Sequence, residues 1–172
     1  MLPRPTARLA FREMADDDLD TMARLLGDPD VMRHYPRPKT REEAQRWIDW
    51  SRRSYSDHGH GLWVIETLDG RFVGDCGLTW QQVDGEPALE VGYHTLPEHQ
   101  RRGYASEAAR ECVRFAFEEL GAGHVVAIIN PDNAASRKVA ERLGMALERA
   151  THDSAGRPVL VYGLRRSEPR GA

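Results

Sequence analysis

The chain has 172 residues, 40% of them hydrophobic and 8% aromatic, which is the composition of a folded globular protein and not of a disordered one. Its formal net charge is −3, so the sequence as a whole is not biased toward nucleic acid or anionic membranes. The N-terminus has no apolar signal segment, and no apolar run is long enough to cross a bilayer. We therefore expect a cytoplasmic protein that binds neither membrane nor nucleic acid.

The first half of the chain predicts one strand and two helices. Residues 9–14 are typical of a short strand, and the acidic run 16–18 is expected to cap a helix that Gly27 ends. Thr40 and Glu43 form a capping-box pattern, in which each side chain accepts a hydrogen bond from the other residue's amide. The second helix therefore begins after Thr40.

Three strands are then expected to form an antiparallel meander, because the links between them are short. The rest of the chain alternates helix and strand and closes with a hairpin. The predicted strands span residues 62–67, 72–80, 88–96, 125–129, 147–152 and 158–165, and the predicted helices after the meander span residues 103–120 and 133–143.

This order, β-α-α-β-β-β-α-β-α-β-β, predicts an α/β protein with a mixed sheet and helices on both of its faces. One long helix connects the strands 88–96 and 125–129, so these two should run parallel. No linker or repeat divides the chain. We expect a single domain over residues 7–165 and a flexible tail over residues 166–172.

The two cysteines, Cys76 and Cys112, both lie in apolar segments. Such thiols are typical of core residues in a reducing compartment, although the sequence alone leaves a disulfide between them open.

The segment from Gln100 to Ala105 opens the crossover helix, at the place where open α/β sheets bind ligands. Gly103 allows a tight turn, and the helix start adds unpaired amides and a positive dipole end. Arg101 and Arg102 add local positive charge. The string alone also fits an ordinary strand-to-helix turn, but its position favours a pyrophosphate site. It matches neither the P-loop nor the dinucleotide-binding pattern.

This segment resembles the acyl-CoA signature, Arg/Gln-x-x-Gly-x-Gly/Ala, of the GNAT superfamily of N-acetyltransferases. The resemblance covers about residues 7–165 and is strongest to the branch that includes the ribosomal-protein N-terminal acetyltransferases. Three stretches carry it: Val31-Met32-Arg33-His34-Tyr35 with Glu42-Glu43-Ala44 and Trp47-Ile48; Glu90-Val91-Gly92-Tyr93 through Pro97 with Gly103-Tyr104-Ala105-Ser106-Glu107-Ala108; and Asn130-Pro131-Asp132-Asn133 through Met145.

The resemblance implies a GNAT-like fold in which the fourth and fifth strands splay apart and the pantetheine arm of acetyl-CoA enters the gap. Backbone groups of Tyr93, His94 and Thr95 match the positions that pair with pantetheine, and Asn133 matches an asparagine that contacts the same arm. The matching pyrophosphate loop consists of Gln100, Arg101, Arg102, Gly103, Tyr104 and Ala105.

An amine attacks a thioester only as the neutral species, so the site must remove a proton from the acceptor and leave the departing sulfur protonated. Glu90 is the first candidate for the base because its strand flanks the thioester in the family. His94, whose ring titrates in the useful range, is the second. The alternatives are an exposed or salt-bridged Glu90 and a packed or hydrogen-bonded His94.

For the acid, many relatives place a tyrosine at the position of Ala140, and this chain departs from that pattern. Ser136 matches a serine that takes this role in the ribosomal-protein branch. A hydroxyl that bonds the backbone of the first helical turn is the equally supported alternative.

The acceptor site is expected between the first two helices, with Tyr35 and Trp47 in its wall, unless both are core aromatics. The loop cations Arg33, Arg37 and Lys39 would attract an acidic substrate or be solvated. The expected acceptor is a primary amine, either a protein N-terminus or a small molecule. The sequence leaves open whether the protein is a monomer or a homodimer.

Two other functions fit the same resemblance: transfer of another acyl group such as succinyl, and a non-catalytic module that senses CoA. We expect no metal site, since His58 and His60 have no further ligands at useful spacing.

Overall fold

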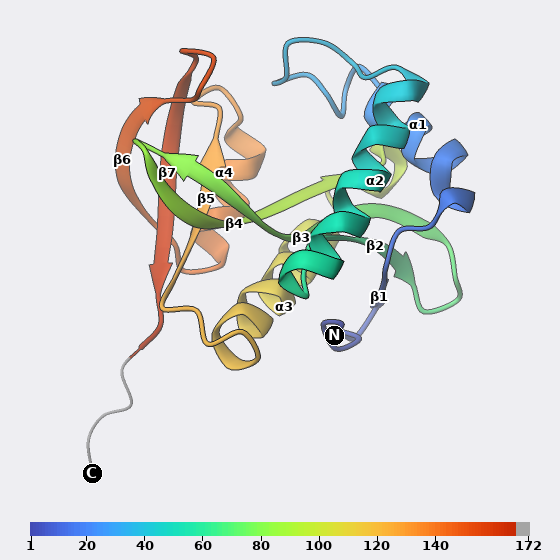
Figure 1. Ribbon diagram of the computed structural model, residues 1–172, viewed down its shortest axis with the longest axis horizontal. Helices are drawn as coiled ribbons and strands as arrows, with labels where there is room; N and C mark the ends of the chain where they lie inside the picture. The colour runs from blue at the N-terminus through green and yellow to red at the C-terminus, as the bar shows by residue number, and fades with distance from the viewer. Residues whose placement is uncertain (168–172) are drawn as a thin grey trace.

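A computed structural model describes residues 1–167 as a seven-stranded mixed sheet with the strand order β1-β2-β3-β4-β5-β7-β6 (Figure 1). This confirms the predicted α/β class and the order of elements. The strands are β1 (Leu9–Arg12), β2 (Leu62–Thr67), β3 (Phe72–Val83), β4 (Glu86–Thr95), β5 (His124–Ile129), β6 (Ala146–His152) and β7 (Pro158–Arg165). The helices are α1 (Leu19–Gly27), α2 (Arg41–His58), α3 (Tyr104–Glu118) and α4 (Ala134–Arg142).

Helices cover both faces of the sheet, and the apolar side chains of β2, which point alternately to the two faces, are buried on each. Trp63 and Ile65 are buried in the core under α3, whereas Leu62 and Val64 are buried in the core under α1 and α2. Successive strand residues point to opposite faces, so a strand between two helix layers is apolar throughout.

The start of α2 confirms the predicted capping box. The Thr40 hydroxyl accepts from the Glu43 amide at 3.2 Å, and the Glu43 carboxylate accepts from the Thr40 amide at 2.8 Å. Gly59, at φ 74°, ends the helix in the left-handed conformation.

The start of α1 differs from the prediction. Residues 16–18 form a 3₁₀ turn, and Asp18, at the N-cap position, makes no side-chain capping bond. Its buried carboxylate instead accepts two hydrogen bonds from Arg12, at 2.7 and 2.8 Å, which lowers the pKa of Asp18 against the opposing effect of burial. The same carboxylate also accepts from the Ala15 amide at 2.8 Å, so Asp18 closes the 3₁₀ turn and pairs with Arg12 but does not cap α1.

The hairpin of β3 and β4 is longer than predicted. Its turn consists of Asp84 and Gly85 alone, both at positive φ (52° and 82°), as in a two-residue hairpin turn. The prediction that the first strand ends at Trp80 was wrong because pairing with β4 continues to Val83. The hairpin tip reaches β6, where Asp84 pairs with Arg149 at 3.3 Å.

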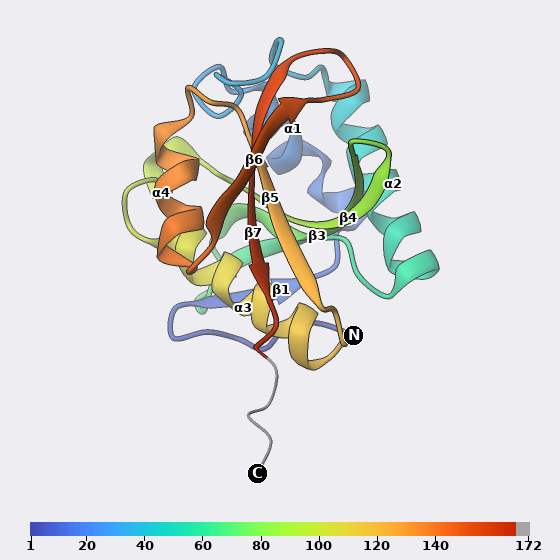
Figure 2. The same cartoon turned by 90° about the vertical axis from the view of Figure 1, so that its left-hand side faces the viewer.

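The predicted parallel crossover is confirmed, and it is short. β4 and β5 share a single register pair, Glu90 with Val126. Beyond Glu90, β4 continues along β3 while β5 turns away, so β5, β6 and β7 run at a steep angle to β1–β4 (Figure 2). The edge of β4 that faces β5 is therefore free from about Val91 onward.

Cys76 and Cys112 are confirmed as buried core residues. They are free thiols between β3 and α3, with their sulfurs 3.6 Å apart. Of the predicted tail, Arg166 donates its amide to the Gly123 carbonyl, and residues 168–172 lie outside the described residues. Within residues 1–167, none of the helices has both the length and the hydrophobicity needed to cross a membrane.

Candidate active site

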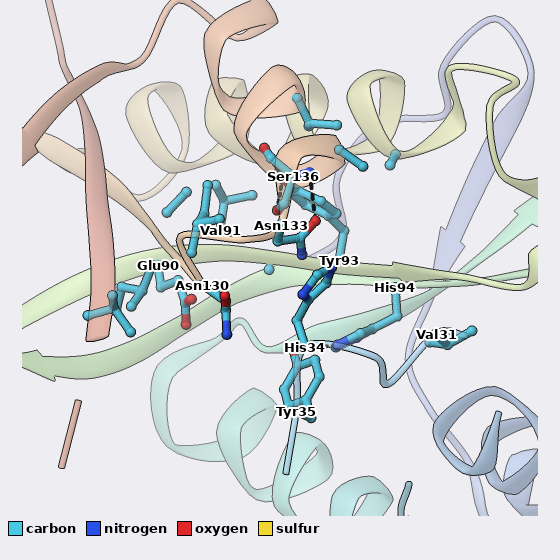
Figure 3. A pocket seen from close by; sticks show the side chains of 18 of the residues that line it. Val31, His34, Tyr35, Glu90, Val91, Tyr93, His94, Asn130, Asn133 and Ser136 are labelled. Carbon is cyan, nitrogen blue, oxygen red and sulfur yellow. Dashed lines mark hydrogen bonds between the residues drawn. The ribbon is translucent and has the colours of Figure 1, made fainter. Parts of the chain in front are cut away.

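A cleft of about 1270 Å³ opens where β4 and β5 diverge. Its walls come from β4 and β5, from the starts of α3 and α4, and from the loop between α1 and α2. Figure 3 shows Tyr93, Asn133 and Ser136 together on the α4 side of β4, and His94 and Tyr35 on its other side. This arrangement follows from strand alternation, because Glu90, Gly92 and His94 point to one face of β4 and Tyr93 to the other.

At one end of the cleft, the loop before α3 presents a series of free amides. Arg101 and Gly103 both adopt positive φ (60° and 80°), and α3 has no side-chain cap. Within residues 1–167, the amides from Arg101 to Ser106 donate no hydrogen bond to any protein group. Consecutive free amides at a helix N-terminus form an anion site, and this one suits a pyrophosphate.

Arg8, just before β1, supports this loop from behind. Its guanidinium donates to the Arg102 carbonyl at 2.9 Å, pairs with Glu107 at 2.6 Å and lies 4.5 Å from the centre of the Tyr104 ring. The loop is thus held from the side opposite to its free amides, so those amides are preorganised for a ligand.

The middle of the cleft is a slot between β4 and α4. At its free edge β4 presents the backbone groups of Tyr93 and Thr95. The backbone groups of His94 point instead to Asp75 of β3, because the bond from the Leu96 amide to the Val73 carbonyl makes every second pair in this register a hydrogen-bonded one. Gln100 donates its side-chain amide to the Thr95 carbonyl at 3.2 Å. Asn133 uses its side-chain oxygen to cap α4, accepting from the Ser136 amide at 3.0 Å, and this bond leaves its NH₂ group available for a ligand. The slot fits an extended arm with amide groups.

Glu90 lies in the wall of the cleft, opposite Thr79 of β3. Burial raises the pKa of Glu90 to about 7, and hydrogen bonding from the Ile128 backbone, the charge of His94 and the Thr79 hydroxyl oppose this rise. A carboxyl with this pKa exchanges a proton readily near neutral pH, as a general base must.

His94 is part of a connected polar chain. Its Nδ1 lies 2.8 Å from Asp75 Oδ1, and its Nε2 lies 2.7 Å from the Tyr35 hydroxyl. The other Asp75 oxygen accepts from the Trp47 indole at 3.0 Å. The structure thus places both predicted acceptor-side aromatics against His94, with ring centroids 5.6 Å (Tyr35) and 5.8 Å (Trp47) away.

On the α4 side, two hydroxyls meet. The Tyr93 hydroxyl lies 2.8 Å from the Ser136 hydroxyl and 3.1 Å from the Ser136 carbonyl. Burial raises the pKa of Tyr93, so its hydroxyl keeps its proton. Ala140 is fully buried, so no hydroxyl comes from the position where relatives carry a tyrosine. Tyr93 brings a tyrosine hydroxyl to this side from β4 instead.

The loop cations between α1 and α2 are already engaged. Arg37 makes two hydrogen bonds to Glu43, Arg33 pairs with Asp30 at 3.0 Å, and Lys39 lies 5.4 Å from the centre of the Trp47 ring. The possibility that these residues attract an acidic substrate therefore loses support.

Sequence reasoning missed Asp75, Arg8 and the reach of the Tyr93 hydroxyl. Asp75 left a signal, because it is a single charged residue in the buried run from Val73 to Leu78. A buried strand tolerates a carboxylate only where polar partners satisfy it. Arg8 and Tyr93 left no such signal, since their partners are distant in sequence.

Comparison with known proteins decides the family. The family model described as the acetyltransferase (GNAT) domain matches residues 8–146 of this chain. The chain belongs to the GNAT family. It is therefore an acetyl-CoA-dependent acetyltransferase, and the predicted family resemblance is confirmed.

Related sequences and solved structures are similar to this chain over nearly its whole length. The uncharacterized protein YkkB of Bacillus subtilis is 38% identical over 159 residues, which cover 91% of this chain and 92% of that protein. An acetyltransferase from Agrobacterium tumefaciens has a TM-score of 0.83 at 27% identity and covers 95% of this chain and 94% of its own. RimL, the ribosomal L7/L12 alpha-N-protein acetyltransferase solved with coenzyme A, shares the fold with a TM-score of 0.77 at 16% identity, covering 96% of this chain and 98% of its own.

Of the two histidines considered for a metal, His60 has its Nδ1 already engaged. His60 is buried with its Nδ1 bonded to the Leu78 carbonyl, and desolvation lowers its pKa. Across residues 1–167, no group of three or more His, Cys, Asp or Glu side chains gathers around a common point.

Proposed function

We propose that the protein transfers the acetyl group of acetyl-CoA to a primary amine by direct attack in a ternary complex. The observation that carries this proposal is the division of proton-handling groups across β4. Glu90, with a pKa of about 7, faces the acceptor side, and the Tyr93 and Ser136 hydroxyls face the α4 side. Bound acetyl-CoA supplies an activated thioester, for which the amides from Arg101 to Ser106 would hold the pyrophosphate and the β4 edge the pantetheine arm.

Glu90 is the proposed base. Its carboxylate takes the proton from the acceptor ammonium, directly or through one water molecule, so that the neutral amine attacks. His94 lies on the same face of β4, and a proton on both of its ring nitrogens would favour the ionised form of the Glu90 carboxylate.

The acceptor is identified by incubating the protein with acetyl-CoA and each member of a panel of small amines and peptides, and measuring the free CoA thiol that is released. The panel includes peptides with free N-termini, because RimL is named as an alpha-N-protein acetyltransferase. We expect at least one amine to release thiol in amounts equal to its acetylated product. Succinyl-CoA, run in parallel, reports on acyl preference. If acetyl-CoA raises the melting temperature but no acceptor ever releases thiol, the protein is a binding module and the proposal is wrong.

Ser136 is the proposed acid, with Tyr93 holding its hydroxyl. Replacing Ser136 with alanine is expected to lower kcat about 100-fold, and replacing Tyr93 with phenylalanine about tenfold. The double variant should match Ser136→Ala alone, since both groups act on one proton. Steady-state kinetics with the best acceptor measure this. Losses that multiply in the double variant, or a larger loss in Tyr93→Phe, would instead make Tyr93 an independent acid.

A further inference from the structure

Asp75 is a fully buried carboxylate outside the set of family-matched residues, and both its oxygens are used. It lies directly across from His94 in the β3–β4 pairing and contacts the His94 Nδ1 at 2.8 Å. Its second oxygen accepts from the Trp47 indole at 3.0 Å. Asp75 itself does not line the cleft, but both of its partners, His94 and Trp47, do, so this buried carboxylate calls for an explanation in terms of the cleft.

The bond directions in this network follow from the groups themselves. An indole nitrogen only donates, and an ionised carboxylate only accepts. His94 must therefore carry its proton on Nδ1 when it bonds Asp75, which leaves Nε2 of the neutral ring as an acceptor. The Tyr35 hydroxyl, 2.7 Å away, then donates to Nε2. With a neutral His94 ring, the donor and the acceptor of each hydrogen bond from Trp47 through Asp75 and His94 to Tyr35 are therefore fixed.

Tyr35 depends on this bond for its place in the cleft wall. The residue is 42% exposed and belongs to the loop between α1 and α2, and within residues 1–167 its hydroxyl has no other hydrogen-bond partner. Its backbone is tied only locally, by the bond from its amide to the Met32 carbonyl. The position of the ring over the cleft is thus set from the His94 side.

We propose that Asp75 is a positioning residue of the acceptor site: it fixes His94 as the Nδ1–H tautomer, so that Nε2 holds Tyr35 and its loop against the cleft. The inference rests on the proposed function, because it takes this side of β4 to be the acceptor side. The other charged group facing His94 is Glu90, which lies on the same face of β4. Asp75 acts through His94 and does not touch the reacting atoms.

Asp75→Asn provides a specific test, because asparagine has one acceptor oxygen and one donor NH₂ group. The Trp47 indole still requires an acceptor, so the amide oxygen should turn toward Trp47 and the NH₂ group toward His94. The His94 ring must then accept on Nδ1 and carry its proton on Nε2. We expect this tautomer change in long-range ¹H–¹⁵N spectra of the imidazole, with His94→Gln assigning the signal among the seven histidines.

A second substitution should reverse the change. In Asp75→Asn with Trp47→Phe, the indole donor is gone, so the asparagine oxygen is free to face His94 and the Nδ1–H tautomer should return. Trp47→Phe alone should keep that tautomer. A merely structural role for Asp75 predicts no such rescue. If Asp75→Asn leaves the tautomer unchanged, or the double variant fails to restore it, the proposal is overturned.

Kinetics test the consequence for the acceptor site. Tyr35→Phe removes the bond to His94 Nε2 and is expected to raise the KM for the amine about tenfold, the value of one lost hydrogen bond, while the KM for acetyl-CoA stays the same. In Asp75→Asn the Tyr35 hydroxyl can accept from Nε2–H instead of donating to Nε2, so this bond is reversed and the amine KM should rise by a smaller factor. Tyr35→Phe should leave the tautomer unchanged, and it keeps the test available if Asp75→Asn does not fold. An unchanged amine KM in Tyr35→Phe contradicts the proposal. The imidazole spectra need no substrate, so they separate a failure here from a failure to find any acceptor.

Discussion

Replacing Glu90 with glutamine is expected to lower the rate of acetyl transfer by a factor of about 100 to 1000, the range typical of losing a general base. Glutamine keeps the size of the side chain and its bond to the Ile128 backbone but cannot take a proton. Binding of acetyl-CoA should be unchanged, because Glu90 faces the acceptor side of β4. Single-turnover rates and a thermal-shift titration with acetyl-CoA measure the two quantities separately.

Glu86→Gln is the matched control. Glu86 begins the same strand but is exposed at the hairpin end, so its substitution should leave the rate unchanged. Should Glu90→Gln retain the wild-type rate, the base lies elsewhere and His94 becomes the candidate. Should both variants lose activity equally, the effect is one of strand stability.

The pH profile offers an independent check on the same residue. A base must be deprotonated to act, so kcat/KM of the wild type should fall as pH drops below about 7, the pKa of Glu90. The acceptor amine ionises identically with either enzyme. The ratio of wild-type to Glu90→Gln rates therefore isolates the carboxyl, and we expect that ratio to decline below pH 7.

The same substitution should stabilise the protein at high pH. The pKa of Glu90 is raised on folding, so the folded state binds the proton more tightly than the unfolded state. This tighter binding adds to the free energy of unfolding at low pH, and the added stability is lost as pH rises from about 4.5 to about 7. A pKa shift of that size corresponds to a stability difference of about 3 kcal/mol, and access of water to Glu90 through the open cleft makes the difference smaller. Glu90→Gln should thus melt above the wild type at pH 8, with little difference at pH 5. Greater stability with lower activity is the pattern of a functional carboxylate.

The sequence predicted those features whose causes are local. The capping box of Thr40 and Glu43 contains both partners of each bond within four residues, so the start of α2 was predicted correctly. Gly144, at φ 84°, ends α4 for the same kind of reason. The parallel crossover followed from chain order alone. In each case the physical cause lies within one element or its connection.

The features that sequence reasoning missed depend on contacts between distant segments. Asp18 has the composition of a helix cap, but Arg12 lies close enough in the fold to take both its oxygens. β3 extends past Trp80 because β4 pairs with it there, although Gln81 and Gln82 have little strand character of their own. The network of Asp75 joins groups 19 and 28 residues away in the chain. A single sequence does not show such proximity.

Replacing Gly103 with alanine is expected to weaken acetyl-CoA binding at least tenfold. Gly103 has φ 80°, and a Cβ there would meet only the Arg8 guanidinium at 3.4 Å, an ordinary contact. Strain and not crowding is therefore the cause: a left-handed alanine costs about 1 kcal/mol. Rotating φ to relieve it turns the neighbouring peptide planes, and with them the amides between Arg101 and Ser106, away from the pyrophosphate. Isothermal titration with CoA measures the loss.

Gly121, just beyond the other end of α3, makes the comparison decisive. It also has positive φ (68°), and no atom lies within 4 Å of where a Cβ would be, so Gly121→Ala carries the same backbone strain without touching the cleft. Both variants should lose about 1 kcal/mol of stability, but Gly121→Ala should bind CoA like the wild type. Equal weakening in both would mean that binding only reports the stability of α3. Normal binding by Gly103→Ala would show that the pyrophosphate lies outside this loop. The free amides are assigned to the phosphates if both variants lose stability equally and Gly103→Ala alone loses affinity for CoA.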